Sequence, residues 1–146
     1  MNKSAFIFWT SWLKILAYLL VGMGLFFGLF HQTDWFGRLL VEPMGQPFWG
    51  DQPPKGEVLR FIGFLYAVLG ATLIGWGLMI VFLVRHALTQ RKAWAWKALC
   101  WGGCFWYALD TGWSLFYGVW ANVALNSLLL LAVWLPLLKL RPHCQD

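Results

Sequence analysis

Charged residues divide the chain into long apolar segments. Residues 15–33 and 61–84 carry no charged side chain, and residues 98–138 carry only Asp110. A helix needs about 20 mostly apolar residues to cross the hydrocarbon core of a bilayer. The last segment is about two spans long, and residues 112–118 are suited to a tight turn within it. The pattern therefore predicts four membrane-spanning helices, at about residues 8–30, 59–84, 94–114 and 118–138.

Composition places these helices in a membrane. The 146 residues are 60% hydrophobic and 12% charged, against about 25% charged in a soluble domain. A soluble domain of this size has too little interior to bury so many apolar side chains. A soluble enzyme is therefore excluded, as is a nucleic-acid-binding module, because a basic binding patch needs solvated faces. We predict one all-α domain, an integral membrane four-helix bundle that is multi-pass in the bacterial inner membrane.

The distribution of charge predicts the orientation of the bundle. Lysine and arginine accumulate in the cytoplasmic loops of membrane proteins. One predicted side carries Lys3, Arg85, Arg91, Lys92, Lys97, Lys139 and Arg141, whereas acids outnumber bases in the 31–57 loop on the other side. Both termini are therefore predicted to be cytoplasmic (N-in/C-in), with the long loop between helices 1 and 2 outside. The start of the chain also has the pattern of a signal peptide, but no small-x-small cleavage site closes it, so a retained helix is favoured.

The predicted outer loop, residues 31–57, exceeds the ~12–15 residues beyond which loops usually have a structure or function of their own. Thr33 is expected to cap a short helix over 34–41, which Pro43 would end. Apolar side chains of this helix, Phe36 among them, are expected to lie among lipid headgroups. Two interpretations stay open: a loop lying on the membrane surface, or a docking surface for another protein.

Small residues mark the faces through which the helices are expected to pack. Lipid tails are as apolar as leucine, so helices in a bilayer associate by close backbone contact and hydrogen bonds. The first span carries a GxxxG pair and the second a stripe of glycines at helical spacing. The predicted packing residues are Gly24, Gly28, Gly63, Gly70 and Gly77. GxxxG is also typical of helices that form homodimers, so self-association is an alternative.

Asp110 is an ionisable residue inside the third predicted span. Such residues are functional candidates by default, as proton relays or cation sites. Arg60 begins the second span on the same side, so an Asp110–Arg60 pair is predicted, although each side chain leans toward the N-terminus of its own helix. Asn122 and Asn126 share one face of the fourth helix, and together with Ser114 they complete a candidate polar pocket. Hydrogen bonding between helices is the structural alternative for all of these residues.

Cysteine and histidine positions predict no metal and no cofactor. Cys100 and Cys104 are one helical turn apart, which is not the CxxC spacing of redox enzymes, and a further ligand for a metal is missing. The histidines lie at span ends or in the tail, so a bis-histidine haem is not expected. Phosphate-binding glycine loops and catalytic motifs are absent from the sequence as well, and no catalytic residue is predicted.

Two functional hypotheses from different classes follow. The first is a non-catalytic accessory, assembly or scaffold subunit of a larger membrane complex, with lipids and other membrane subunits, or a second copy, as partners and no nucleic acid. The second is a small transporter or lipophile-binding protein with an outward-facing pocket around Asp110. In hydropathy layout the chain resembles small bacterial four-span proteins such as the DoxX-like group. That resemblance lies in hydropathy and not in motifs, so it transfers no residue roles.

Overall fold

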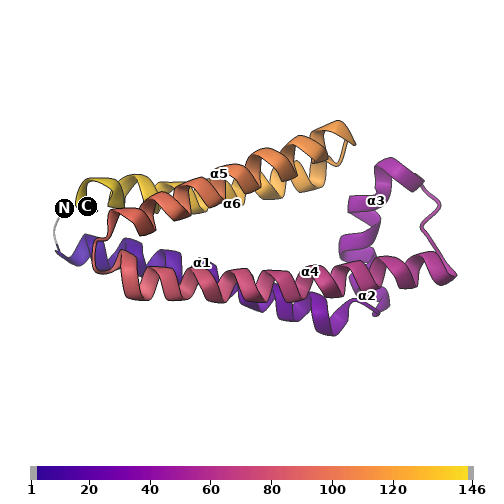
Figure 1. The fold of residues 1–146 in the computed structure, drawn as a ribbon. Coiled ribbons are helices and arrows are strands. Elements are labelled where there is room, and N and C mark those ends of the chain that lie inside the picture. Colours follow the sequence, from indigo (N-terminus) through magenta and orange to yellow (C-terminus); the bar gives the residue numbers. More distant parts are fainter. Residues whose placement is uncertain (1–2, 145–146) are drawn as a thin grey trace.

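The computed structural model describes residues 3–144, and this part of the chain is all-α with no sheet. Figure 1 shows the long helices lying side by side, with a smaller helical segment at one end. The long helices are α1 (Lys3–Phe30), α4 (Gly56–Leu83), α5 (Ala93–Phe116) and α6 (Trp120–Leu140). The shorter elements are α2 (Asp34–Phe36), α3 (Glu42–Trp49), the π-helical turns η1 (Gly37–Val41) and η2 (Val84–Leu88), and the 3-10 turn η3 (Arg141–His143).

Three of the long helices are apolar enough and long enough to cross a membrane. They are α1, α4 continued through η2 to Leu88, and α6. The prediction of a multi-pass membrane protein is supported at this level. The remaining helix, α5, has 24 residues, about 36 Å at 1.5 Å per residue. It is not among the three candidate spans, and it carries Lys97 and Asp110.

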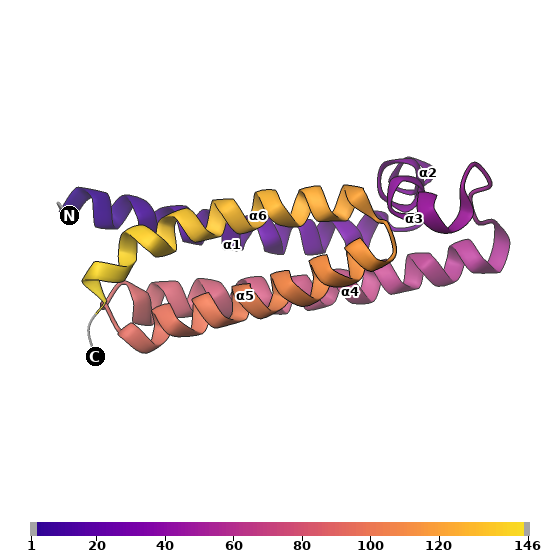
Figure 2. The same ribbon diagram turned by 90° about the horizontal axis from the view of Figure 1, so that it is seen from above.

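The long helices form two hairpins. The α1–α4 pair shares the most extensive interface, α5 lies along α6, and α6 also contacts α1. At one end of the bundle, here called the terminal end, α1 begins, η2 turns the chain and α6 finishes; the opposite end, the loop end, holds α2 and α3 (Figures 1 and 2). At the loop end, α4 projects beyond the α5–α6 turn in both views.

Small residues bring the backbones of α1 and α4 together. A Cβ placed on Gly70 would lie 2.5 Å from the carbonyl oxygen of Gly24, and one on Gly77 would lie 2.9 Å from that of Ala17. Gly63 faces His31 across the same interface, at 3.3 Å. Gly28 contributes only its backbone nitrogen to this contact, because a Cβ on Gly28 would meet no atom within 4 Å. The interface is therefore one that side chains larger than hydrogen at Gly24, Gly70 or Gly77 would force apart.

Two separate apolar cores hold the bundle. At the terminal end, buried side chains from α1, η2, α5 and α6 meet: Phe6, Leu13, Val84, Ala87, Leu88, Ala95, Leu137 and Leu140. Ile80 and Leu83 of α4 pack against them. At the loop end, Phe27, Phe36 and Val41 form a core with Tyr66 packed against it. The second core joins α1, α4 and the α2–η1 segment and receives nothing from the α5–α6 hairpin. The hairpin is thus held chiefly at its terminal end.

Two tryptophans join other helices to the backbone of α6. Pro136 lies inside α6, and since proline has no N–H it leaves the carbonyl of Ala132 without its usual helical donor. The indole Nε1 of Trp12 on α1 donates to that carbonyl at 3.0 Å. Trp96 Nε1 on α5 donates to the carbonyl of Leu137 at 2.8 Å. Both indole N–H groups thus donate to main-chain carbonyls of α6.

The outer loop is more helical than the sequence predicts. Helical structure runs from Asp34 to Trp49, so the prediction that Pro43 ends the helix is wrong. The π-helical turn directly before Pro43 is wider than an α-turn, which gives the ring space against the preceding turn. The helix ends instead at Gly50, where φ is +55°, a value that favours glycine.

Two side-chain predictions for this loop also need correction. The Thr33 hydroxyl donates to the carbonyl of Phe30 at 2.7 Å and makes no cap to the following helix. Phe36 is completely buried against Phe27 and Tyr66, whereas it was expected among lipid headgroups. The Phe27 and Tyr66 rings offer a more extensive apolar contact than the interface does, which explains the difference.

Candidate functional site

Asp110, Ser114 and Asn122 form one hydrogen-bonded cluster near the loop end of the α5–α6 hairpin. Asn122 Nδ2 donates to Asp110 Oδ1 at 2.7 Å and to Ser114 Oγ at 2.8 Å. Ser114 Oγ donates in turn to the main-chain carbonyl of Asp110 at 2.7 Å. Ser114 is buried and the other two residues are half-buried. Each hydrogen of the Asn122 amide thus has an acceptor on the facing helix.

Two further polar contacts continue this cluster toward the middle of the bundle. Asn126 Nδ2 approaches Thr111 Oγ1 at 3.4 Å, and both residues are buried. One turn deeper, Tyr107 and Ser127 share a hydrogen bond of 3.2 Å between their hydroxyls. We call the seven residues Tyr107, Asp110, Thr111, Ser114, Asn122, Asn126 and Ser127 the polar seam. The seam runs along the α5–α6 interface from the loop end inward.

The depth of the seam follows from helix geometry. At 1.5 Å per residue, Asp110 lies about 9 Å and Tyr107 about 13 Å from the end of α5 at Phe116. Polar groups at such depth have few water partners, so they need partners within the protein. Among residues 3–144, no buried side-chain nitrogen or oxygen lacks a hydrogen-bond partner. The seam therefore satisfies its own buried groups.

Asp110 has hydrogen-bond donors but no cationic partner in the described part of the chain. Its Oδ1 accepts from Asn122, with the Ser114 hydroxyl 3.4 Å away, and its Oδ2 makes no hydrogen bond with a described residue. A carboxylate held by neutral donors with one free oxygen can take up a proton or coordinate a small cation. This is the one chemical capacity that the geometry of the seam supports.

The structure does not bring Arg60 to Asp110. Arg60 Nη1 is paired with Glu57 Oε1 at 2.8 Å, and both side chains are largely exposed. The predicted Asp110–Arg60 pair is therefore wrong. Arg60 lies in the first turns of α4 (Figure 1), the part that projects beyond the α5–α6 turn, so the two residues are at different levels of the bundle. The other four residues of the predicted polar pocket, Asp110, Ser114, Asn122 and Asn126, all belong to the seam.

Sequence reasoning missed Tyr107 and Ser127. Their spacing holds a signal: Ser127 directly follows Asn126, and Tyr107 lies one turn before Thr111 on the face of α5 that carries the seam. Pairing the two helices as an antiparallel hairpin around residues 117–119 would have placed them opposite each other. Tyrosine in an apolar helix is more often an interfacial residue, which hid this contact.

The cysteines lie outside the seam. Cys100 and Cys144 pack against the terminal-end core, and Cys104 is exposed on α5. Burial raises the pKa of the Cys144 thiol, and this effect outweighs the smaller lowering by Arg91. Within residues 3–144, no group of three or more histidine, cysteine or acidic residues is placed to hold a metal ion.

Comparisons of the chain with protein-family models, with curated proteins and with solved structures find no match. The function is therefore inferred from the geometry of the chain itself.

Proposed function

We propose that this protein is a non-catalytic accessory, assembly or scaffold subunit that packs beside other subunits of a larger complex in the bacterial inner membrane. The observation that carries the proposal is the exposed face of α5. Large side chains, most of them aromatic, follow one another along this helix at helical spacing, each 58% exposed or more: Trp94, Trp101, Phe105, Leu109, Trp113 and Phe116. We call these six residues the α5 stripe.

The α5 stripe belongs to the helix that is least suited to lipid. The other three long helices are apolar enough to cross a membrane and α5 is not among them, while the buried residues of α5 are Ala93, Ala95, Thr111 and Ser114. Gly102 and Gly112 on the same helix have no neighbour that a Cβ would meet. Open glycines beside aromatic side chains let another helix approach closely. These features favour the packing of a protein partner on α5 over contact of α5 with lipid alone.

Connectivity supports four membrane crossings. The chain leaves α4 at the terminal end, and α6 runs back to that same end from the loop end (Figure 2). If α4 and α6 both cross the membrane, α5 has to cross between them. The seam residues of α5 turn toward α6, where their hydrogen-bonding groups find partners. A less apolar helix can therefore cross the membrane without exposing these groups to lipid.

Charge supports an orientation with both termini in the cytoplasm. The basic residues Arg85, Arg91 and Lys92 lie at the terminal end, in and next to η2, which is the arrangement that the positive-inside rule predicts for the cytoplasmic side. A reporter fused after residue 146 should be active only in the cytoplasm. Activity confined to the periplasm would reverse the proposed orientation.

Co-purification tests the proposed role. The tagged protein, extracted from native membranes in mild detergent, should elute with other polypeptides or with an untagged second copy. The double variant Trp101→Ala with Phe105→Ala on the α5 stripe should lose that association. The control Met79→Ala with Phe82→Ala removes side chains of similar exposure from α4 and should keep it. Recovery of the wild-type protein alone, with a bound lipid or small molecule, would contradict the proposal.

A second candidate function, a small transporter or lipophile-binding protein, is favoured by the free carboxylate oxygen of Asp110. On this hypothesis Asp110 exchanges a proton or a cation with the outside. Asp110→Asn should then abolish proton or cation flux in liposomes while the fold stays intact. A flux that is absent from wild-type liposomes too would remove this candidate.

A further inference from the structure

A cavity of about 420 Å³ opens at the loop end between the finish of α1 and the start of α4. His31 and Gln32 line it from the α1 side, and Glu57, Arg60 and Phe64 line it from the α4 side. Because α1 ends at Phe30 and α4 begins at Gly56, the cavity lies where the two apolar helices reach the membrane surface. This is the depth of lipid headgroups, whichever side of the membrane the loop end faces.

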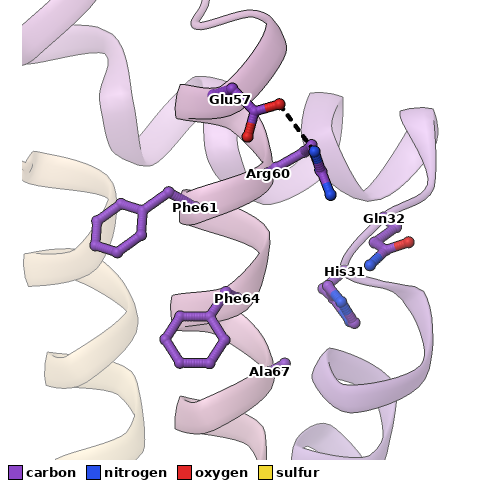
Figure 3. A pocket seen from close by; sticks show the side chains of 7 residues that line it. All are labelled: His31, Gln32, Glu57, Arg60, Phe61, Phe64 and Ala67. Atoms are coloured by element: carbon purple, nitrogen blue, oxygen red, sulfur yellow. Dashed lines mark hydrogen bonds and ion pairs between the residues drawn. The ribbon is translucent and has the colours of Figure 1, made fainter.

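The rim of this cavity carries one positive and one negative charge, side by side. Figure 3 shows the Arg60 guanidinium extending toward Gln32 and His31, with Glu57 one turn above it. Arg60 uses Nη1 for the 2.8 Å contact to Glu57 Oε1. A guanidinium has five N–H donors, so most of them stay available, as does the second carboxylate oxygen. The rim can therefore bind an anionic and a cationic group of one ligand at the same time.

Two aromatic residues and an alanine of α4 complete the lining of the cavity. Phe61 and Phe64 stack with ring centroids 6.5 Å apart and are 59% and 58% exposed. Below them Ala67 presents only a methyl group (Figure 3). The groove thus pairs a charged rim at headgroup depth with an aromatic and small-residue surface that extends toward the hydrocarbon region.

We propose that this cavity binds one phospholipid whose head group is zwitterionic and ends in a primary ammonium, as in phosphatidylethanolamine. Arg60 binds the phosphate, since guanidinium recognises phosphate by paired hydrogen bonds. Glu57 accepts hydrogen bonds from the ammonium, and an acyl chain lies on Phe61 and Phe64. A choline head group has no N–H to donate to Glu57, and a glycerol head group has no positive charge. The site would therefore select the ammonium. This inference does not depend on the proposed protein partner.

Lipid binding to the delipidated, detergent-purified chain tests the proposal. Native mass spectrometry would compare phosphatidylethanolamine, phosphatidylcholine and phosphatidylglycerol with the same acyl chains. Phosphatidylethanolamine should bind more tightly than either of the others by roughly fivefold, the upper range for an exposed ion pair. Arg60→Gln should weaken all three phospholipids, and Glu57→Gln should remove the preference for ethanolamine over choline.

Matched control variants separate the site from general surface charge. Arg38→Gln and Glu42→Gln remove exposed charges at the same end of the molecule but outside the cavity, and should leave both the affinities and the preference unchanged. All four substitutions are of exposed residues, and unchanged helicity by circular dichroism would establish that the variants are folded. Equal binding of the three lipids, or equal losses in the control variants, would overturn the proposal. Glycerophosphoethanolamine, the head group without acyl chains, should compete only weakly, and competition as strong as that of the lipid would also overturn it.

Discussion

Single residues in this molecule show how an apolar environment sets the requirements for backbone hydrogen bonds. Pro136 removes one donor inside α6, and Trp12 on α1 supplies another from 3.0 Å away. In a membrane an unsatisfied carbonyl has no water to replace the missing donor. The Trp12 indole therefore supplies the hydrogen bond that Pro136 removes from the neighbouring helix α6.

The Trp12–Pro136 relation predicts a dependence between two substitutions. Trp12→Phe removes the indole N–H and should lower the free energy of unfolding by about 0.5–1.5 kcal/mol. In a Pro136→Ala background the new backbone N–H of residue 136 can bond to the Ala132 carbonyl, so the cost of Trp12→Phe should shrink. Unfolding by sodium dodecyl sulfate in mixed micelles measures both costs. If Trp12→Phe lowers the free energy of unfolding equally in the two backgrounds, the Trp12 indole does not donate to the Ala132 carbonyl.

Asp110 and Asn122 should be coupled in stability. Their 2.7 Å hydrogen bond crosses the α5–α6 interface, and such bonds in membrane proteins contribute about 0.6 kcal/mol on average and up to about 1.7. A double-mutant cycle of Asp110→Ala with Asn122→Ala should give a coupling energy in that range. The matched cycle of Asp110→Ala with Arg60→Ala should be additive within about 0.5 kcal/mol, because Arg60 is paired with Glu57. Coupling in the second cycle and none in the first would show that Asp110 is paired with Arg60 and not with Asn122.

Among the elements, the α1–α4 hairpin has the most regular contact. Gly63, Gly70 and Gly77 recur every seventh residue along α4. They face His31, which directly follows α1, and Gly24 and Ala17 of α1, and these three are also seven residues apart. A seven-residue repeat keeps the same face of each of two nearly antiparallel helices in contact over several turns. The glycines let the two backbones approach closely, which is consistent with this interface being the most extensive one.

Glycine substitutions on α4 test this interface with a control on the same helix. Gly70→Ala places a methyl group 2.5 Å from the Gly24 carbonyl oxygen, and such overpacking should cost about 1–3 kcal/mol of stability. Gly75 has no neighbour within 4 Å, so Gly75→Ala should be neutral or slightly stabilising because alanine favours helix. Gly70→Leu should disrupt folding altogether. Thermal unfolding in detergent distinguishes the variants, and equal melting temperatures for Gly70→Ala and Gly75→Ala would place this face toward lipid.

The outer loop shows where the sequence is least informative. Proline before a polar, glycine-rich stretch usually ends a helix, and here the π-helical turn Gly37–Val41 allows the helix to continue to Trp49. That choice depends on Phe36, which is buried between Phe27 and Tyr66. The contact is between segments that are distant in sequence, so the local pattern of residues 31–57 could not predict it.

Across the whole molecule, hydropathy predicts the long helices and their order, and it does not predict how the two hairpins meet. The helix lengths follow from charge spacing, as for residues 61–84. The α5–α6 turn, residues 117–119, overlaps only the end of the predicted region 112–118, because α5 continues to Phe116. Arg60 was predicted beside Asp110 from its place at a span end. The projection of α4 beyond the other hairpin separates the two residues, and hydropathy along the chain holds no information on that offset.

The same arrangement leaves α5 on the outside of the bundle. Its seam residues point to α6, and the side chains of the α5 stripe point away from the protein. The α5–α6 hairpin joins the rest of the molecule mainly through the terminal-end core, together with the contact of Phe48 on α3 with Tyr117, whose ring centroids are 5.6 Å apart. A partner on α5 would bury the face that the chain itself leaves open.

Site-specific photo-crosslinking in intact membranes tests the central claim most directly. A benzophenone amino acid would replace Trp101 on the α5 stripe or, as the control, Met79 on the exposed face of α4, two positions that are 65% and 67% exposed. Irradiation should give one discrete protein adduct from position 101, either with another subunit or with a second copy of this chain, and lipid adducts from position 79. Lipid adducts alone from both positions would contradict the account, because α5 would then face the bilayer.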